Sequence, residues 1–334
     1  MQNKKINIID TTLYDGSYAV SHSFTQEQAK DLVCGLDAAG VDIIEVNNGD
    51  GISDSPVNYG FLKNLGILEA SGRVVKNARL AVPFYPGVGN IDDLKRARDC
   101  GASVVRIGTH VTEAAIATAH IRWAKQNGMF VCGVLMMSHM GNRVKIVEQA
   151  NTFAEAGADY INLADSTGHM IPEDVRSRVA AIKNSIDLPV GFHAHNNLGM
   201  AVANTLAAVE AGAEYVDATC RGLGPGAGNT QTEVICTILK RQGWNIGVDI
   251  YDVMDVAEDI VEPIVLHQPQ IIRTESLMLG YAGVYSSFLL QTRKAAEKFG
   301  LASRDILVEL GRRHMLGSQE NMIADVAYEL SCKR

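Results

Sequence analysis

One pattern recurs along this chain: a glycine after small or polar residues, followed by a run of β-branched and apolar residues, as in DAAGVDIIEV and EAGADYINLA. A glycine in this position ends a helix in the left-handed conformation. The apolar run that follows is typical of a buried parallel strand. The pattern occurs at five glycines, which are Gly40, Gly101, Gly128, Gly157 and Gly212. The repetition predicts a series of βα units.

The spacing of these glycines predicts how many units there are. Successive glycines lie 61, 27, 29 and 55 residues apart, so each of the two long gaps has room for a hidden unit. Strand-like runs at 78–83 and 188–195 fill those gaps, and residues 5–10 supply one more strand. Eight βα units form a closed (β/α)8 barrel of about 250 residues. An open doubly wound sheet is the alternative, but no GxGxxG motif follows the first strand.

The pattern changes beyond about residue 245. Residues 250–334 contain several amphipathic stretches and no further clear strand. We therefore expect an α/β protein, with a catalytic TIM barrel over 1–245 and a helical C-terminal extension over 246–334. Within the barrel, Thr25 and Gln28 have the spacing of a capping box, which predicts a helix beginning after Thr25.

Composition narrows the class of protein. Lys and Arg number 30 against 38 Asp and Glu, which gives a net charge of −8 and argues against a nucleic-acid or anionic-membrane binder. The six cysteines form no CxxC pair, so we interpret them as small buried side chains in a reducing compartment. An apolar run long enough for a membrane span is absent, and Asp10 argues against a secretory signal. These features predict a cytoplasmic protein.

Polar residues follow nearly every predicted strand. Because the carboxyl ends of barrel strands meet at one mouth, we expect these side chains to form a single site there. They are Asp10, Asp15, Asn47, Asn48, Asp50, Arg106, Thr109, His110, Ser138, His139, Asp165, Ser166, His193, His195, Arg221 and the loop 222–229.

His193 and His195 are the sharpest local feature. Residues i and i+2 of a strand point the same way, so both imidazoles enter the mouth together. Two imidazoles and a carboxylate suit a divalent metal, and Asp15 supplies the carboxylate if strands 1 and 7 lie on opposite sides of the mouth. The alternative is that the histidines only form hydrogen bonds.

Other features leave alternatives open. The loop GLGPGAGN at 222–229 either binds an anion through its backbone N–H groups or is a tight turn that requires glycine. His120, His267 and His314 are interpreted as surface or packing residues. Four further histidines lie near strand ends and are secondary candidates for ligand contact: His22, His110, His139 and His169.

The segments DTTLYDG (10–16), HAHNN (193–197) and GLGPGAGN (222–229) identify a family resemblance. The chain resembles the 4-hydroxy-2-oxovalerate (4-hydroxy-2-ketoacid) aldolases, within the larger group of hydroxymethylglutaryl-CoA lyase and isopropylmalate synthase. Further segments support the resemblance from about residue 6 to 330, namely GDGISDSPVNYGF, THVTEA, LMMSHM, LADSTG and LGYAGVYSSFL.

The resemblance implies a barrel that binds a divalent metal, Mn2+ in the first place, with Co2+ or Mg2+ also suited. Asp15, His193 and His195 match the family's metal ligands. A pyruvate-type 2-oxoacid would chelate the metal, and an aldehyde would be the second product or substrate. Ser166 matches a residue near the oxoacid, and Tyr285 matches a catalytic tyrosine beside the aldehyde-derived end. Three more residues are expected to bind substrate, and these are Asp165, Asn229 and His22.

The sequence departs from the family at two catalytic positions. Tyr14 stands where relatives have the arginine that steadies the enolate oxygen, and Tyr18 stands where they have the histidine assigned as the base. A tyrosine hydroxyl donates one hydrogen bond but brings no charge, and loss of one strong donor costs about 10²–10³ in rate. We interpret the two changes as retuned specificity.

Two other functions remain open at this point. The chain could be a catalytically weak subunit that binds an acylating aldehyde dehydrogenase, which family aldolases pair with through the barrel and C-terminal region. It could also be an acyl-CoA condensing enzyme of the citramalate synthase type. The resemblance further implies assembly into a homo-oligomer.

Overall fold

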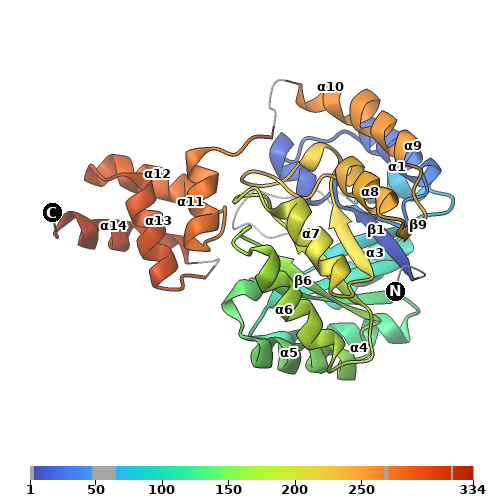
Figure 1. The fold of residues 1–334 in the computed structure, drawn as a ribbon, viewed down its shortest axis with the longest axis horizontal. Coiled ribbons are helices and arrows are strands. Elements are labelled where there is room, and N and C mark those ends of the chain that lie inside the picture. Colours follow the sequence, from blue (N-terminus) through green and yellow to red (C-terminus); the bar gives the residue numbers. More distant parts are fainter. Residues whose placement is uncertain (1–3, 47–64, 267–269, 317–318, 334) are drawn as a thin grey trace.

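Eight parallel strands close into a barrel in the computed structural model, which describes residues 4–46, 65–266, 270–316 and 319–333. The strands pair in the order β2 to β8 and then β1, and β1 also pairs with β2. Their bounds are β1 Lys5–Asp10, β2 Ile43–Glu45, β3 Arg79–Phe84, β4 Val104–His110, β5 Phe130–Met136, β6 Tyr160–Asp165, β7 Val190–Ala194 and β8 Tyr215–Ala218. The predicted TIM barrel is confirmed, including both hidden units (Figure 1).

A ring of helices covers the outside of the barrel. Each of the five repeated glycines has a positive φ, between 77° and 107°, as the left-handed end of a helix requires. Thr25 and Gln28 form the predicted capping box at the start of the first helix. The helices are α1 Gln26–Ala38, α2 Gly66–Gly72, α3 Ile91–Asp99, α4 Thr118–Gln126, α5 Arg143–Ala156, α6 Pro172–Lys183, α7 Ala201–Glu210 and α8 Thr232–Arg241.

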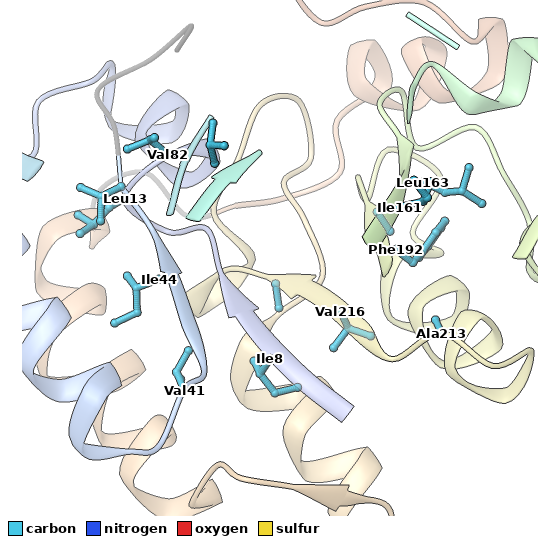
Figure 2. Close-up of a cluster of buried hydrophobic side chains, with 14 of the residues drawn as sticks. Ile8, Leu13, Val41, Ile44, Val82, Ile161, Leu163, Phe192, Ala213 and Val216 are labelled. Carbon is cyan, nitrogen blue, oxygen red and sulfur yellow. The ribbon is translucent and has the colours of Figure 1, made fainter. Parts of the chain in front are cut away.

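Strand side chains alternate between two separate cores. One set points outward and packs under the helices, as Ile8, Ile44 and Val216 do in Figure 2. The other set points into the barrel and forms its own cluster, which contains Ile9, Ile43, Ala81, Val104, Cys132, Tyr160 and Tyr215. Two residues further along β2, β4, β6 and β8, the inward positions turn polar: they are Glu45, Arg106, Asn162 and Asp217. The barrel is therefore closed below by apolar side chains and carries a buried polar layer beneath its mouth.

The chain after the barrel divides into two parts by packing. β9 Asn245–Ile246 pairs with β1, so one short strand lies where the predicted barrel region ends. The next helices, α9 Ile250–Asp255, the π-helical turn Val256–Val261 and α10 Glu262–Val265, add buried side chains to the barrel's outer core. A division at residue 245 remains a prediction.

Four helices form a second hydrophobic core beside the barrel (Figure 1, red). They are α11 Thr274–Ala282, α12 Phe288–Phe299, α13 Ser303–Arg312 and α14 Ile323–Ser331. We call these four helices the C-terminal bundle.

Histidines of two mouth loops hold the C-terminal bundle against the barrel. His139, after β5, contacts the carbonyl oxygen of Gly283 at 3.2 Å, and His169, after β6, contacts that of Gly280 at 2.7 Å. A carbonyl oxygen only accepts, so each ring nitrogen donates. A Cβ on Gly280 would lie 2.8 Å from Leu198 Cγ and 3.0 Å from the carbonyl oxygen of Gly168. The end of α11 therefore lies directly on the loops that follow β6 and β7.

Two expectations about the surface can be compared with the structure. Cys132, Cys220 and Cys236 are buried, as expected. Cys34 and Cys332 are exposed, because Cys34 lies on the solvent side of helix α1 and Cys332 follows α14, near the end of the chain. In the part of the chain that is described, helices long and apolar enough to cross a membrane are not found.

The contact at Gly280 leads to a stability prediction. Replacing Gly280 with Val should lower the free energy of unfolding by about 1–3 kcal/mol, because the new side chain overlaps Leu198. Chemical denaturation would measure the loss. The double variant Gly280→Val/Leu198→Ala should regain part of it, and an equal loss in both variants would contradict this account of the junction.

Candidate metal centre and active site

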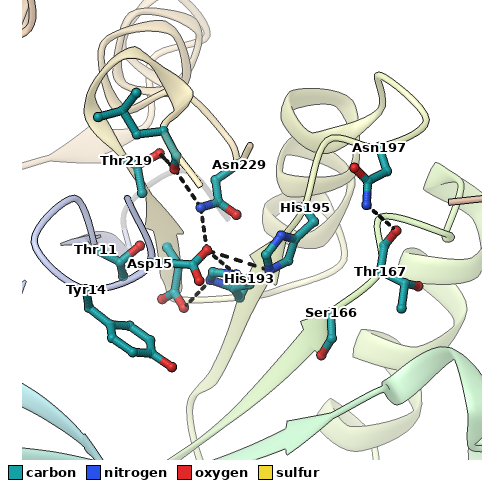
Figure 3. Close-up of polar contacts among 12 residues, drawn as sticks. Thr11, Tyr14, Asp15, Ser166, Thr167, His193, His195, Asn197, Thr219 and Asn229 are labelled. Carbon is teal, nitrogen blue, oxygen red and sulfur yellow. Dashed lines mark hydrogen bonds and ion pairs between the residues drawn. The ribbon is translucent and has the colours of Figure 1, made fainter. Parts of the chain in front are cut away.

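Asp15, His193 and His195 come together at the barrel mouth. One ligand atom from each lies within 4.8 Å of the other two. The Nε2 atoms of His193 and His195 are each 3.6 Å from Asp15 Oδ2. Figure 3 shows the three side chains pointing toward one another, with Tyr14 and Ser166 on either side. The cluster predicted from sequence is present, with the donor set of a divalent metal site.

The strand order explains how these residues meet. His193 and His195 face the mouth from β7 and its end, and Asp15 begins the 3-10 helix Asp15–Val20 after β1. Strands 1 and 7 do not lie on opposite sides of the mouth, which was the condition set for Asp15 to join the histidines. In the closed barrel β8 alone separates them, so Asp15 reaches the histidines across one neighbouring strand.

The glycine-rich loop 222–229 serves to place Asn229. Asn229 Nδ2 donates to Asp15 Oδ2 and to the carbonyl oxygen of Leu223, and its backbone pairs with that of His195. A Cβ on Gly228 would lie 1.9 Å from the carbonyl oxygen of Gly222, so only glycine fits there. The backbone N–H groups of 227–229 donate within the protein, which supports a tight turn over an anion-binding loop.

A buried ionic network lies directly beneath the triad. Arg106 donates to Glu45 Oε2 at 2.6 Å and to Asp217 Oδ2, and its side chain is 4% exposed. Asp217 Oδ2 also accepts from His193 Nδ1 at 3.1 Å and from Asn162 Nδ2 at 3.2 Å. The network therefore joins β2, β4, β6 and β8 to a residue of the triad.

The pKa values reflect this concentration of carboxylates. Burial opposes the shift, but the neighbouring histidines lower the pKa of Asp15 to about 2. For His193, burial is outweighed by the neighbouring carboxylates of Asp15 and Asp217, which raise the pKa to about 10, whereas burial lowers the pKa of His195 to about 4. Burial raises the pKa of Glu45 to about 7 against the effect of Arg106. The carboxylates thus favour a positive charge at the triad.

The two departures from the family lie on the loop that carries Asp15. Tyr14 forms a hydroxyl–hydroxyl contact with Tyr85, from the loop after β3. Burial, together with Tyr85, raises the pKa of Tyr14 well above 10, so its hydroxyl stays protonated at neutral pH. The Tyr18 ring packs edge-on against His22, with centroids 4.5 Å apart, and His22 Nδ1 lies 2.8 Å from Ser17 Oγ.

Residues after β6 differ in what they contact. Both oxygens of Asp165 accept backbone N–H groups, from His169 and Met170 at 3.0 Å each, so this carboxylate holds the loop in place. Ser166 Oγ accepts from the backbone N–H of Met137 at 3.0 Å. Substrate binding by Asp165 and Ser166 stays a prediction.

Tyr285 belongs to the turn before α12 rather than to a barrel loop. Its ring lies 6.2 Å from that of Phe288, centroid to centroid. Burial raises its pKa, and Glu113, in the loop after β4, adds to the shift. Tyr285 is thus within electrostatic range of a mouth loop, and the histidine contacts of the C-terminal bundle fix the turn nearby.

Several residues of the site were missed or lie elsewhere. Sequence reasoning did not select Glu45, Tyr85, Asn162 or Asp217, although a polar residue two positions after an inward apolar residue, as in IIE and YVD, could have indicated three of them. His120 packs against Phe84, as expected. Asn47, Asn48, Asp50 and His267 lie outside the described residues.

Comparison with known proteins decides the family. The HMGL-like family model matches residues 5–260, and a DmpG-like communication domain matches residues 270–332. The chain belongs to the HMGL-like family. It is 59% identical to a 4-hydroxy-2-oxovalerate aldolase of Moorella thermoacetica, over 100% of this chain and 99% of the relative. A protein of the same name from Carboxydothermus hydrogenoformans is 55% identical over 98% of each chain. The resemblance inferred from sequence is confirmed.

Solved structures of other proteins share the fold. The N-terminal domain of a putative aldolase from Bacteroides vulgatus superposes with a TM-score of 0.74 at 20% identity, covering 88% of this chain and 98% of that one. The carboxyl transferase domain of Rhizobium etli pyruvate carboxylase gives 0.80 at 17% identity, over 99% of this chain and 61% of that one. At these identities the likeness concerns the fold alone.

The buried network leads to a second stability prediction. Arg106→Met keeps the side chain's length but leaves Glu45 and Asp217 without their cation, which should lower the free energy of unfolding by about 3–5 kcal/mol. Urea denaturation would measure this. Lys145→Met, which removes an exposed ion pair with Glu148, is the matched control and should cost at most about 1 kcal/mol. Equal effects would show that burial does not matter here.

Proposed function

We propose that this protein is a divalent-metal-dependent aldolase that cleaves or forms 4-hydroxy-2-oxoacids, using a pyruvate-type 2-oxoacid and an aldehyde. The observation that carries the proposal is the Asp15, His193 and His195 triad at the mouth of an HMGL-like barrel. Whole-length relatives named 4-hydroxy-2-oxovalerate aldolase support it. The enzyme class is a carbon–carbon lyase.

The residues fit a divalent cation. Two imidazole nitrogens and a carboxylate oxygen are suitable ligands for Mn2+ and similar ions. Asn229 Oδ1 is buried and has no hydrogen-bond partner among the described residues, while its amide nitrogen donates to Asp15. This oxygen is available to a cation or to substrate. We infer Mn2+ as the natural ion, with Co2+ and Mg2+ as alternatives.

The chemistry follows from the position of the site. A divalent cation bound by the triad would act as a Lewis acid that stabilises negative charge on the keto oxygen of a 2-oxoacid. Retro-aldol cleavage develops that charge when the bond between C3 and C4 breaks and the 4-hydroxyl proton leaves. Tyr14 remains protonated and can donate to the developing oxyanion. Ser166, Asp165, Asn229 and His22 are proposed to position the substrate.

Tyr18 and Tyr285 are proposed to act at the aldehyde end. Tyr18 packs edge-on against His22, and the two side chains are proposed to assist removal of the 4-hydroxyl proton. Tyr285 comes from the C-terminal bundle, which the histidine contacts hold at the mouth. A change in the position of the bundle would therefore move Tyr285 relative to the proposed aldehyde end of the site.

The DmpG-like communication domain suggests a partner. We infer that the C-terminal bundle binds an acylating aldehyde dehydrogenase, which would consume the aldehyde. Homo-oligomer formation is part of the same proposal. A catalytically weak subunit and a citramalate synthase-like enzyme are not favoured, because the whole-length relatives carry the aldolase name.

The metal requirement can be tested with one pair of variants. His195→Ala should weaken Mn2+ binding by more than the roughly 10–100-fold that loss of an outer-sphere partner costs, and should abolish pyruvate release from 4-hydroxy-2-oxovalerate. Calorimetric titration and a coupled pyruvate assay would measure the two effects. His120→Ala removes a histidine that packs on Phe84 and should change neither. Pyruvate release unaffected by chelators would rule out the metal mechanism.

The role of Tyr14 can be tested separately. Tyr14→Phe removes the proposed oxyanion donor and should lower kcat by about 10²–10³. Tyr85→Phe removes only its hydroxyl partner and should have a much smaller effect. Steady-state kinetics across 4-hydroxy-2-oxoacids of increasing chain length would compare both with Tyr14→Arg, which should lose activity on the preferred substrate. A Tyr14→Phe variant with unchanged kcat would remove Tyr14 from the mechanism.

A further inference from the structure

Asp217 accepts three hydrogen bonds inside the barrel. It lies on β8 and is 1% exposed. Its Oδ2 atom accepts from Arg106, from Asn162 and from His193 Nδ1. Asp217 is not among the ligand atoms grouped at the triad. Its contact with the triad is made through a single ring nitrogen of His193.

That contact determines which way the His193 imidazole faces. Arg106 and Asn162 can only donate to Asp217 Oδ2, so this oxygen acts as an acceptor and the ring nitrogen beside it, Nδ1, carries the hydrogen. In a neutral imidazole the other nitrogen, Nε2, then has the free lone pair. Nε2 is the atom that faces Asp15 Oδ2, at 3.6 Å. The hydrogen bond thus selects the tautomer and the ring orientation that a metal ligand needs.

The other neighbours of Asp217 are hydrogen-bond donors, so its Oδ2 atom acts as an acceptor. Arg106 places a permanent positive charge against Oδ2 from β4, on the far side from β8. Asn162 adds an amide donor from β6, and it has room to do so because residue 191, two positions before His193, is glycine. A Cβ on Gly191 would lie 2.3 Å from Asn162 Oδ1. Arg106, Asn162 and His193 therefore all donate to one acceptor atom, Asp217 Oδ2.

His195 shows that this arrangement is particular to His193. Its Nε2 also faces Asp15, but its hydrogen bond on the protein side goes to the backbone of Pro225 and not to a carboxylate. The two histidines of the triad are thus fixed in different ways, one by a charged side chain and one by a peptide group. Loss of a side chain at position 217 would disturb only the first.

We propose that Asp217 is a positioning residue that fixes His193 as an Nε2 metal ligand, with Arg106 and Asn162 donating to the same Asp217 oxygen. The inference rests on the proposed metal-dependent function, because it concerns the ligand quality of His193. Outer-sphere partners of this kind typically contribute 10–100-fold to metal affinity or activity. A purely structural role for Asp217 would instead affect stability and leave metal affinity unchanged.

The test uses the full chain with Mn2+ alone as the probe. Asp217→Asn should bind Mn2+ 10–100-fold more weakly than the natural protein, as measured by electron paramagnetic resonance of free Mn2+. Asp37→Asn is the matched control, because Asp37 is also a buried carboxylate but, among the described residues, accepts only from the backbone N–H groups of 76–78. It should lose stability and keep its Mn2+ affinity.

Each result has a definite meaning. Unchanged Mn2+ affinity in Asp217→Asn, with the natural protein binding normally, would overturn this inference and leave the proposed function intact. A natural protein that binds no Mn2+ would overturn both. If Asp217→Asn does not fold, 15N spectra of histidine-labelled natural protein with Zn2+ decide the matter, with His193 assigned by loss of its signals in His193→Gln. Hydrogen on Nδ1 of His193 is expected, and hydrogen on Nε2 would refute the proposal.

Discussion

The ion pairs of Arg106 with Glu45 and Asp217 are the interaction on which the site depends. A guanidinium buried in a barrel interior is stable only if carboxylates satisfy its donors, and these carboxylates come from β2 and β8, on either side of β1. Breaking one partner leaves an uncompensated charge in a medium of low dielectric. The network therefore ties the closure of the barrel to the geometry of His193.

The polar layer also separates two kinds of packing. Below it, hydrophobic and aromatic side chains fill the barrel. The rings of Tyr160 and Tyr215 stack there with centroids 4.3 Å apart. Above it, the triad, Asn229 and the tyrosine pair of Tyr14 and Tyr85 face the mouth. The upper groups are the ones proposed to bind metal and substrate, while the lower ones pack the barrel. Chemistry and stability thus occupy successive layers of the same strands.

The C-terminal bundle is linked to this site by few but specific contacts. His139 and His169 donate to carbonyl oxygens at the end of α11, and Gly280 allows the helix to approach the mouth loops. The loop of His169 is itself held by Asp165, at the end of β6. A partner bound to the bundle would therefore act on loops that adjoin the proposed substrate position, which gives a physical basis for communication between the two parts.

The sequence alone determined the barrel, because helix-ending glycines and apolar runs are local signals that repeat with the βα unit. It also predicted the cluster of Asp15, His193 and His195, since strand period places the two histidines on one face and the family motif pointed to Asp15. Tertiary structure decided which strands are neighbours across the closure, and so corrected the placement of strands 1 and 7. It also revealed Tyr85 and the contacts of Asp217 and Asn162, because a pattern can mark an inward polar residue but not its partners: Asp217 meets Arg106, 111 residues away, and Asn162, 55 residues away. Such partners are set by how the barrel closes, and no local pattern encodes them.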